Sequence, residues 1–492
     1  MLDARQPSVT LDDRPLELVS NLCAALSRAG VTYCHWKSNE ALARSATGAN
    51  DLDLLVDRRD AGVFVQILSE LTFVRAEMPS ERRSPGVDDY YGLDATGRLV
   101  HVHAHYRLVL GDDATKNYRL PVEEAYLSSA TKDGMFMIPS PEFEYIVFVI
   151  RMILKHANGV AIMCLKGSLS ASERRELYFL RERVQRDGVA QILRDHLSFL
   201  DDELFERCER AIEGESPFHV RMRTAADLQR RLAPWARRPQ RADAVQRLWR
   251  GVYWRLLRYA FNRPPRRRLP SGGKLIAIVG GDGAGKSSTV RDLSESLSQV
   301  FVVDEVHLGK PPQSLASSAL RFARVARRFV LRTPSSTPFR TAATDPQALL
   351  DLLWYVLLAR DRYRAYLKAR RFVEAGGIVV CDRYPVREIR LMDGPKSNLP
   401  PPVRLTRMGR RLTQLEHKVY ERIEAPDILI VLRVDPEIAV QRRTDEDADF
   451  VRTRCAEIWH LDWEATRAWV VDTDRSQDQV LADVKSLVWR EL

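Results

Sequence analysis

The chain has 492 residues, of which 45% are hydrophobic and 29% charged, a composition typical of a globular protein with two or three domains. No apolar run approaches the roughly 18 residues that a membrane-spanning helix needs, and the acidic start lacks the apolar segment of a signal peptide, so we expect neither feature. The formal net charge of +10 is concentrated in residues 230–268, which hold thirteen arginines and a single acid.

Residues 14–130 combine a helix-like start with the short strand-like runs VTYCHW, DLDLLV and LVHVHAHY, and we expect an α+β domain here. Asp51 and Asp53 stand two residues apart on the apolar DLDLLV strand, so their side chains should face the same side. Two carboxylates in this arrangement can share a divalent metal ion. A turn at Ser38 precedes the strand, with twelve residues between Ser38 and Asp51.

The serine turn, the helix-like segment after it and the D-x-D strand resemble the polymerase-beta-like nucleotidyltransferase superfamily over residues 14–130. In that superfamily the serine turn holds the incoming triphosphate and three acids hold two metal ions. Residues 37–39 (KSN) occupy the turn in this chain. The resemblance implies metal binding by Asp51 and Asp53, and the position aligned with the third acid is His103.

The LVHVHAHY run carries His101, His103 and His105 at every second position, so the three imidazoles should face one side of a strand. No Asp or Glu lies within the run. One interpretation is a mixed Asp/His metal site, because imidazole suits zinc-like or manganese-like ions better than Mg²⁺. The others are a fold kept for binding after catalysis was lost, and an ordinary polar sheet face.

Residues 131–230 are predicted to form a helical extension of this domain. The segment PEFEYIVFVIRMILKHANG begins with proline and ends at Gly159, as helices prefer. A second helix, SASERRELYFLRERVQRDG, is predicted to run from the capping Ser170 to a terminal Gly188.

The arginine-rich residues 231–270 are predicted to form a basic amphipathic helix over 241–261, followed by a linker. A helical projection places apolar side chains such as Trp249 and Leu256 on one side and arginines on the other. Such a helix can pack between domains with a solvated basic face, contact an anionic membrane surface, or bind nucleic acid. The sequence favours these interpretations in that order.

Residues 271–492 begin with KLIAIVGGDGAGKSSTVRDLSESL, which holds the pattern G-x-x-x-x-G-K-S between an apolar strand and an amphipathic helix. Small residues let backbone N–H groups wrap a phosphate, and the helix N-terminus adds positive potential. We expect Lys286 to neutralise β/γ-phosphate oxygens and Ser287 to hold Mg²⁺. The predicted ATP-binding residues are Gly280, Gly281, Asp282, Gly283, Ala284, Gly285, Lys286, Ser287 and Ser288.

Further apolar runs alternate with helical patterns and predict a doubly wound parallel sheet, which is an α/β fold. GGIVVCDRYP is a strand that ends at Asp382, where an acid can orient the Mg²⁺ shell together with Ser287. The adjacent Arg383 can reach a transferring phosphate. APDILIVLRVDPEIAVQRR ends at Arg442 and Arg443, near a predicted lid, and WVVDTDRSQDQ supplies the last strand.

These segments resemble thymidylate kinases over residues 274–492, through DGAGKS in the phosphate loop, ARDRYRAY around Arg362, VVCDRYP, and the strand before the lid. The resemblance implies that Asp282 contacts an acceptor sugar hydroxyl and that Arg362 and Arg383 bind the acceptor. Because Ala284 carries no charge, lid arginines would supply it. The predicted catalytic residues are Lys286, Asp382, Arg383 and Arg443.

Two segments differ from that family. VHLGKPP, with His307 and Lys310, stands where the family has an arginine–acid–proline turn that grips the acceptor phosphate. PVREIRLMDGPKSNLPPP stands in place of the family's base-binding segment. The acceptor is therefore left open between thymidylate and another small phosphorylated or hydroxylated molecule.

The sequence thus predicts a nucleotidyltransferase-like domain with a helical extension, followed by a P-loop kinase that uses ATP and Mg²⁺ to phosphorylate a nucleoside monophosphate or similar acceptor. The alternatives are nucleotidyl transfer at the N-terminal D-x-D site and a non-catalytic nucleotide-binding protein at a membrane surface. The six scattered cysteines indicate reduced thiols in a cytoplasmic protein, with peripheral membrane contact and a homodimer left open.

Overall fold

The computed structural model forms two compact units, residues 1–265 and 266–492, which are taken in turn. The side chains at 254–261, 326–330 and 346–348 lie outside the described part of the chain, and so do the predicted helix end at Gly159 and the apolar side chain of Leu256. The backbone is described for residues 14–79, 83–84, 86–112, 115–156, 169–213, 216–261, 266–330, 346–389, 391, 394–398 and 406–492.

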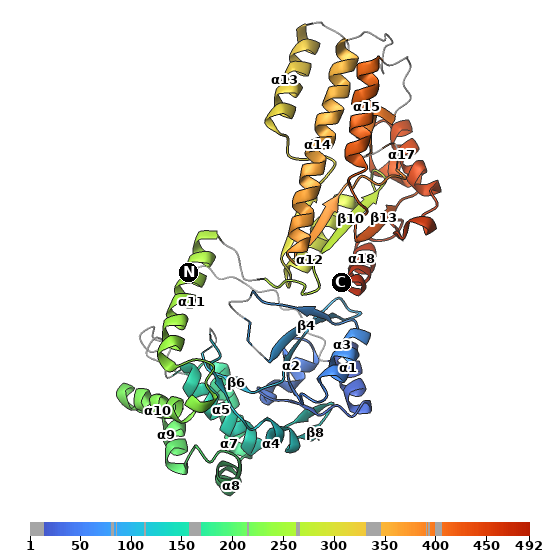
Figure 1. Ribbon diagram of the computed structural model, residues 1–492. Helices are drawn as coiled ribbons and strands as arrows, with labels where there is room; N and C mark the ends of the chain where they lie inside the picture. Colours follow the sequence, from blue (N-terminus) through green and yellow to red (C-terminus); the bar gives the residue numbers. More distant parts are fainter. Residues whose placement is uncertain are drawn as a thin grey trace, which may run out of the picture. The chain divides into compact units, whose positions relative to one another are not determined.

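The N-terminal unit is built on a five-stranded sheet with strands β1 Tyr33–His35, β2 Leu52–Val56, β3 Val74–Ala76, β4 Val87–Leu93 and β5 Leu99–His105. The strand order is β1-β2-β5-β4-β3; of these strands, β4 is labelled in Figure 1. β2 and β5 run parallel, whereas the other neighbouring pairs are antiparallel. Helices α1 (Glu17–Arg28) and α3 (Ala61–Glu70) contribute Leu22, Phe64 and Leu68 to the core on one face of this sheet.

Strand β5 alternates between that core and the opposite face of the sheet. Val102 and Ala104 are buried in the core. The rings of His101, His103 and His105 contact one another in order along the other face. The period of two, which β-strand geometry imposes, therefore gathers the three imidazoles on one side.

The register of this sheet decides which polar residues become neighbours of the histidines. β2 pairs Asp53 with His103, and β4 pairs Asp89 with the same histidine. Acids from two different strands therefore lie on either side of His103.

A second core in this unit joins the sheet to the helical segment. Its centre is the long helix α5 (Pro141–His156), most of whose side chains are buried. Helices in contact with α5 are α7 Ala171–Arg183, α8 Arg186–His196, α9 Asp202–Ile212 and α10 Phe218–Arg231. The short elements are α2 Leu42–Ala46, α4 Glu123–Ser128, β6 Val109–Leu110, β7 Tyr118–Arg119, β8 Thr131–Asp133, β9 Phe136–Ile138 and the 3₁₀ turns η1 Asn39–Ala41 and η2 Ala233–Trp235.

The helix predicted from Ser170 to Gly188 is in fact two helices. Ser170 caps α7 as predicted and forms a capping box with Glu173. α7 nevertheless ends before Val184, which takes an extended conformation, and Gly188 lies inside α8. The predicted helix end at Gly188 is therefore wrong. Glycine is tolerated inside a helix, and a Cβ at this position would meet the Glu142 side chain at 3.1 Å.

Helix α11 (Gln240–Phe261) forms the basic segment. Trp249 on this helix is exposed, whereas Asp243 is buried and pairs with Arg247 at 3.2 Å. No helix in the described part of the chain is both long and apolar enough to cross a membrane. Peripheral membrane contact through residues 241–261 stays a prediction.

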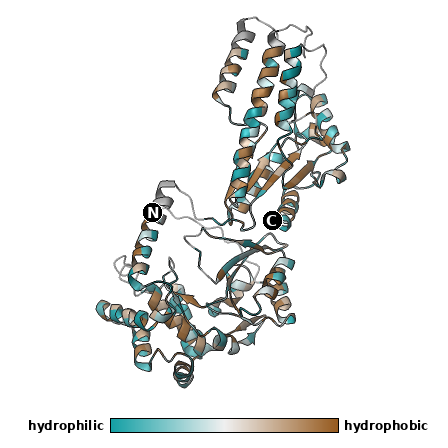
Figure 2. Ribbon diagram, viewed as in Figure 1, coloured by the Kyte–Doolittle hydropathy of each residue, from teal (hydrophilic) through white to brown (hydrophobic). Residues whose placement is uncertain are grey.

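The C-terminal unit is built on a sheet with strands β10 Lys274–Gly280, β11 Val303–His307, β12 Ile378–Asp382, β13 Ile428–Arg433 and β14 Trp469–Asp472. The order is β11-β12-β10-β13-β14 and every neighbouring pair is parallel, which confirms the predicted α/β class. β10 and β13 are largely hydrophobic (Figure 2), as expected for strands covered on both faces. The helices are α12 Lys286–Ser298, α13 Leu315–Val330, α14 Pro346–Glu374, α15 Arg407–Tyr420, α16 Pro436–Arg442, α17 Ala448–His460 and α18 Gln477–Glu491, with 3₁₀ turns η3 Lys396–Asn398 and η4 Glu464–Thr466.

The cap at Ser170 provides a test of the helical segment. Ser170→Ala removes the oxygen that accepts a hydrogen bond from the Glu173 N–H. We expect the free energy of unfolding of this unit to fall by about 1 kcal/mol, the usual size of a lost N-cap. Urea unfolding followed by circular dichroism measures the change. Ser69→Ala, at an exposed helical position in α3, is the control; an equal loss in both variants would contradict the assigned cap.

Candidate functional site

The loop between β10 and α12 owes its shape to its glycines. Gly283 and Gly285 have φ angles of +78° and +83°, in the left-handed region that favours glycine. A Cβ at Gly281 would lie 2.6 Å from Sγ of Cys455, so close packing excludes a larger residue there. The first-turn N–H groups of α12, which follow Gly285, have no acceptor within their own helix and can bind an anion.

Lys286, the first residue of α12, bends back over this loop. Its Nζ donates to the carbonyl oxygen of Gly281 at 2.6 Å and lies 4.0 Å from Oδ1 of Asp282. The side chain is buried, so water screens the positive charge of Lys286 only weakly at the loop. A phosphate in the loop would therefore meet both the ammonium and the backbone N–H groups.

Ser287 and Asp382 meet at the edge of the sheet where β10 and β12 end. The Ser287 hydroxyl donates to Oδ2 of Asp382 at 3.1 Å. The other carboxylate oxygen, Oδ1, is buried and has no hydrogen-bond partner among the described residues. A hydroxyl and a carboxylate with a spare oxygen are the hard donors that Mg²⁺ prefers, so the pair fits this ion.

Arg383, directly after β12, has a φ of +59°. A non-glycine residue in this region is strained by about 1–3 kcal/mol, and such residues cluster at functional sites. Its Nη2 lies 3.7 Å from Oδ1 of Asp282, and Nη1 of Arg454 lies 2.8 Å from Oδ2 of the same carboxylate. Together with Lys286, three cations surround Asp282. Sequence reasoning missed Arg454, which lies in α17 outside any motif.

Arg362, predicted to bind the acceptor, lies in α14 with an exposed fraction of 1%. Its Nε donates to the carbonyl oxygen of Leu308 at 2.6 Å and its Nη2 to that of Gly309 at 3.3 Å. Its Nη1 contacts the Tyr420 hydroxyl. The guanidinium therefore holds the turn that follows β11.

Arg442 and Arg443, the predicted lid arginines, lie at the end of α16. Arg442 donates to the carbonyl oxygen of Gly283 at 3.4 Å and to that of Thr473 at 3.0 Å. Arg443, predicted to be catalytic, pairs with Glu446 in its own segment. Of the two arginines, it is Arg442 whose guanidinium is bonded to the phosphate loop in this structure.

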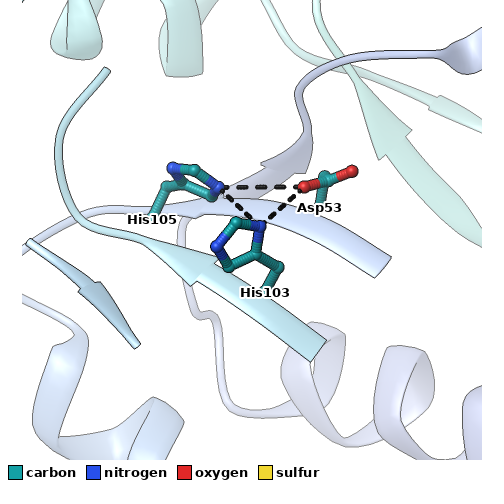
Figure 3. Close-up of side chains that lie close together, drawn as sticks. All are labelled: Asp53, His103 and His105. Atoms are coloured by element: carbon teal, nitrogen blue, oxygen red, sulfur yellow. Dashed lines mark hydrogen bonds and ion pairs between the residues drawn. The ribbon is translucent and has the colours of Figure 1, made fainter. Parts of the chain in front are cut away.

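A separate cluster in the N-terminal unit contains Asp53, His103 and His105 (Figure 3). Oδ1 of Asp53 lies 3.1 Å from Nδ1 of His103 and 3.8 Å from Nε2 of His105, and these two nitrogens are 3.3 Å apart. Nζ of Lys37 lies 2.8 Å from the same oxygen. Burial acts to raise the pKa of Asp53, but the Lys37 ammonium and the two imidazoles outweigh it and hold that pKa well below its usual range. Burial lowers the pKa of His105 to about 3.

Asp51 belongs to a neighbouring group. Its Oδ1 lies 2.8 Å from Nδ1 of His101, whose Nε2 lies 2.7 Å from Oδ1 of Asp89. Burial acts to lower the pKa of His101, but the two carboxylates outweigh it and raise that pKa. His101 therefore bridges Asp51 and Asp89.

The predicted second site, Asp51, Asp53 and His103, is thus divided between two groups. Asp53 and His103 lie together as predicted, whereas Asp51 turns to the neighbouring histidine. His105 was predicted to face the same side but was not included in the second site, where the structure has it as the third member of the cluster. Sequence reasoning also missed Asp89, which only the pairing of β4 with β5 brings to the cluster.

The turn at Ser38 has a left-handed φ of +60°. Its N–H donates to Oε1 of Glu176 at 3.0 Å, and the N–H of Asn39 donates to Oε1 of Glu144 at 3.4 Å. Burial raises the pKa of Glu144 to about 7. Side chains of α5 and α7 therefore occupy the N–H groups that the resemblance assigns to a triphosphate.

No protein-family model matches the chain. Over 223 residues the chain is 26% identical to the uncharacterized ATP-binding protein YghR of Escherichia coli K12. This alignment covers 44% of the chain and 86% of YghR. Over 225 residues the chain is 27% identical to the thymidylate kinase of Symbiobacterium thermophilum. This alignment covers 43% of the chain and 91% of that enzyme. About 44% of the chain is thus homologous to these sequences, a length close to that of the C-terminal unit.

Solved thymidylate kinase structures also match the chain. The enzyme from Ehrlichia chaffeensis is 19% identical, covers 44% of this chain and 98% of its own, and has a TM-score of 0.27. The enzyme from Candida albicans is 18% identical, covers 44% of this chain and 91% of its own, and has a TM-score of 0.31.

The buried acid Glu144 predicts a pH-dependent stability. Its pKa rises from 4.5 to about 7 on folding, so the folded chain keeps a proton that the unfolded chain loses. The contribution of Glu144 to the free energy of unfolding should therefore fall as the pH rises from about 4.5 to about 7, whereas the lowered pKa of His105 acts in the opposite direction. Glu144→Gln keeps an acceptor for Asn39 and removes the titration, so the fall should be smaller.

Thermal unfolding across this pH range measures the effect in both chains. Glu142→Gln, on the same helix but not fully buried, is the matched control and should keep the wild-type dependence. An unchanged pH dependence in Glu144→Gln would assign the titration to another group.

Proposed function

We propose that the C-terminal unit transfers the γ-phosphoryl group of ATP to a nucleoside monophosphate or a similar small acceptor. The observation that carries this proposal is the position of Ser287 and Asp382 directly beside the glycine loop, with one buried carboxylate oxygen left for a metal ion. Homology to an ATP-binding protein and to a thymidylate kinase supports the same class of reaction.

In the proposed reaction the loop N–H groups and Lys286 bind the β- and γ-phosphates. Lys286 reaches them by giving up its hydrogen bond to Gly281. Ser287 and Asp382 would hold Mg²⁺, which neutralises charge on the phosphate oxygens when it is bound. Phosphoryl transfer requires little covalent chemistry from the protein. The rate acceleration would therefore come mainly from positioning of the reactants and electrostatic stabilisation of the transition state.

Arginines would meet the charge on the transferring phosphoryl group. Arg383 is held at the end of β12 beside Asp282, and Arg442 already contacts the loop. Arg443 would join them by leaving Glu446. These arginines come from the end of β12 and from the predicted lid segment. They could therefore contact the phosphoryl group from two sides while it moves from ATP to the acceptor.

The acceptor is proposed to bind beside Asp282. This carboxylate can accept a hydrogen bond from a sugar hydroxyl, and Arg383 and Arg454 stand next to it to meet a phosphate. Arg362 supports the site through the turn after β11, whose carbonyl oxygens it binds. Thymidylate is the first acceptor to test, because one similar protein is named a thymidylate kinase and another a probable thymidylate kinase.

Nucleotidyl transfer in the N-terminal unit is not favoured by the geometry of its turn. The N–H groups at Ser38 and the next residue are bonded to Glu176 and Glu144. A triphosphate would have to displace two carboxylates before it could bind this turn.

An acceptor screen with ATP labelled in the γ-phosphate tests the proposal. We expect label to appear on one of the nucleoside monophosphates, in a reaction that requires a divalent ion. Lys286→Met keeps much of the side-chain length and loses the ammonium, so kcat/KM should fall about a hundredfold or more. Lys274→Met, at the opposite end of β10, should keep the wild-type rate. Absence of transfer to every acceptor, or a wild-type rate in Lys286→Met, would overturn the proposal.

A second variant tests the metal-binding role of Asp382. Asp382→Asn keeps the shape of the side chain and removes its charge. Changes in the outer shell of a metal site typically cost about 10–100-fold in metal affinity, and loss of a ligand charge should cost at least as much. The Mg²⁺ concentration that gives half of the maximal rate should therefore rise by about tenfold or more. Asp304→Asn, on the neighbouring strand β11, is the control. An unchanged Mg²⁺ requirement in Asp382→Asn would remove Asp382 from the site.

A further inference from the structure

We propose that Asp53, His103 and His105 form a binding site for a divalent transition metal ion of the zinc class. The site lies in the N-terminal unit and is independent of the proposed kinase reaction. Its ligand set differs from the one that the D-x-D pattern suggests, because His105 takes the place of Asp51.

The spacing of the three atoms suits one bound ion. Oδ1 of Asp53, Nδ1 of His103 and Nε2 of His105 form a triangle with sides of 3.1, 3.3 and 3.8 Å (Figure 3). Two ligands of a tetrahedral zinc ion, each about 2.0–2.1 Å from the metal, are about 3.4 Å apart. The ion can therefore bind all three atoms with little movement of either strand.

Hydrogen bonding satisfies this cluster only in part. Nδ1 of His103 carries one hydrogen at most, so its contacts with Asp53 and His105 must share that hydrogen, and Nδ1 of the buried His105 has no hydrogen-bond partner among the described residues. Two imidazole nitrogens and a carboxylate oxygen nevertheless converge on one point. A metal ion accepts all three lone pairs at once, and two imidazoles favour zinc-like ions over Mg²⁺.

The surroundings hold the ligands and leave access on one side. Asp53 and His105 have exposed fractions of 8% and 4%, and the His105 ring packs edge-on against Trp36 with ring centres 5.0 Å apart. An ion held by three protein atoms has one coordination position left for water, as in catalytic zinc sites. His103 is only partly buried, so solvent can reach the site on this side. Nε2 of His103 lies 4.0 Å from Oδ1 of Asp89, beyond hydrogen-bond distance, and that oxygen is bonded to His101 at 2.7 Å.

Lys37 is the competitor for this site. Its ammonium lies 2.8 Å from Oδ1 of Asp53, the oxygen that the metal ion needs. The Lys37 side chain is 24% exposed, so it can turn into solvent when a divalent ion enters. Removing the Lys37 charge should therefore tighten metal binding. If the cluster instead depended on the Lys37–Asp53 ion pair, the same change would loosen the cluster and would not tighten metal binding.

Zinc binding to the untagged full-length chain tests the proposal. After loading with ZnCl₂ and dialysis, elemental analysis should find one zinc ion per chain that excess Mg²⁺ does not displace. Co²⁺ in place of zinc should give the visible absorption of a four- or five-coordinate ion. His103→Ala and His105→Phe should each weaken zinc binding more than about a hundredfold, beyond the usual effect of outer-shell changes. Lys37→Met should bind zinc several-fold more tightly than the wild type.

Two matched controls come from the neighbouring group. His101→Ala removes a histidine from the same strand and face, and Asp51→Asn removes the other acid of the D-x-D pattern; both should keep zinc. Circular dichroism checks folding, and if the buried His105 variant does not fold, the partly exposed His103 variant decides. A wild-type chain without bound zinc, unchanged binding in His103→Ala, or an equal loss in Asp51→Asn would overturn the proposed ligand set.

Discussion

The parallel pairing of β10 with β12 is the constraint on which the C-terminal site depends. The register places Ile278 opposite Asp382, so the phosphate loop after β10 and the carboxylate at the end of β12 emerge at the same edge of the sheet. Ser287, in the first turn of α12, then reaches Asp382 at 3.1 Å. A shift of one residue in either strand would turn Asp382 to the other face and separate the pair. Open parallel sheets bind ligands at this edge for the same reason.

The N-terminal unit uses strand pairing in a different way. Its cluster lies on the face of a sheet, where pairing of β2 with β5 brings Asp53 to His103. In both units a buried carboxylate is surrounded by positive or hydrogen-bonding groups, with Lys286 and Arg454 beside Asp282 and Lys37 beside Asp53. Such partners offset part of the cost of removing a charge from water. They also leave each carboxylate close to groups that a ligand can displace.

How much the sequence predicts depends on the distance along the chain between the residues concerned. The position of the glycine loop between β10 and α12 could be predicted because its glycines, lysine and serines are contiguous and follow an apolar strand; that the loop binds phosphate stays a prediction. Arg454 and Asp89 could not be predicted, because tertiary packing and strand pairing, rather than a local pattern, bring them to their sites. Arg362 is predicted from its motif to bind the acceptor, which stays a prediction, and its burial could not be read from the motif. The helix end predicted at Gly188 is wrong because glycine, which often ends helices, also occurs inside them.

We propose that chemistry on ATP takes place at the loop that holds Lys286 and not at the cluster of Asp53, His103 and His105. The most direct test compares acceptor phosphorylation by Lys286→Met and Asp53→Asn in the same assay, with Mg²⁺ as the added metal. We expect a fall of about a hundredfold or more for Lys286→Met and a rate within about twofold of the wild type for Asp53→Asn. Loss of product formation in Asp53→Asn, with the rate of Lys286→Met preserved, would contradict this proposal.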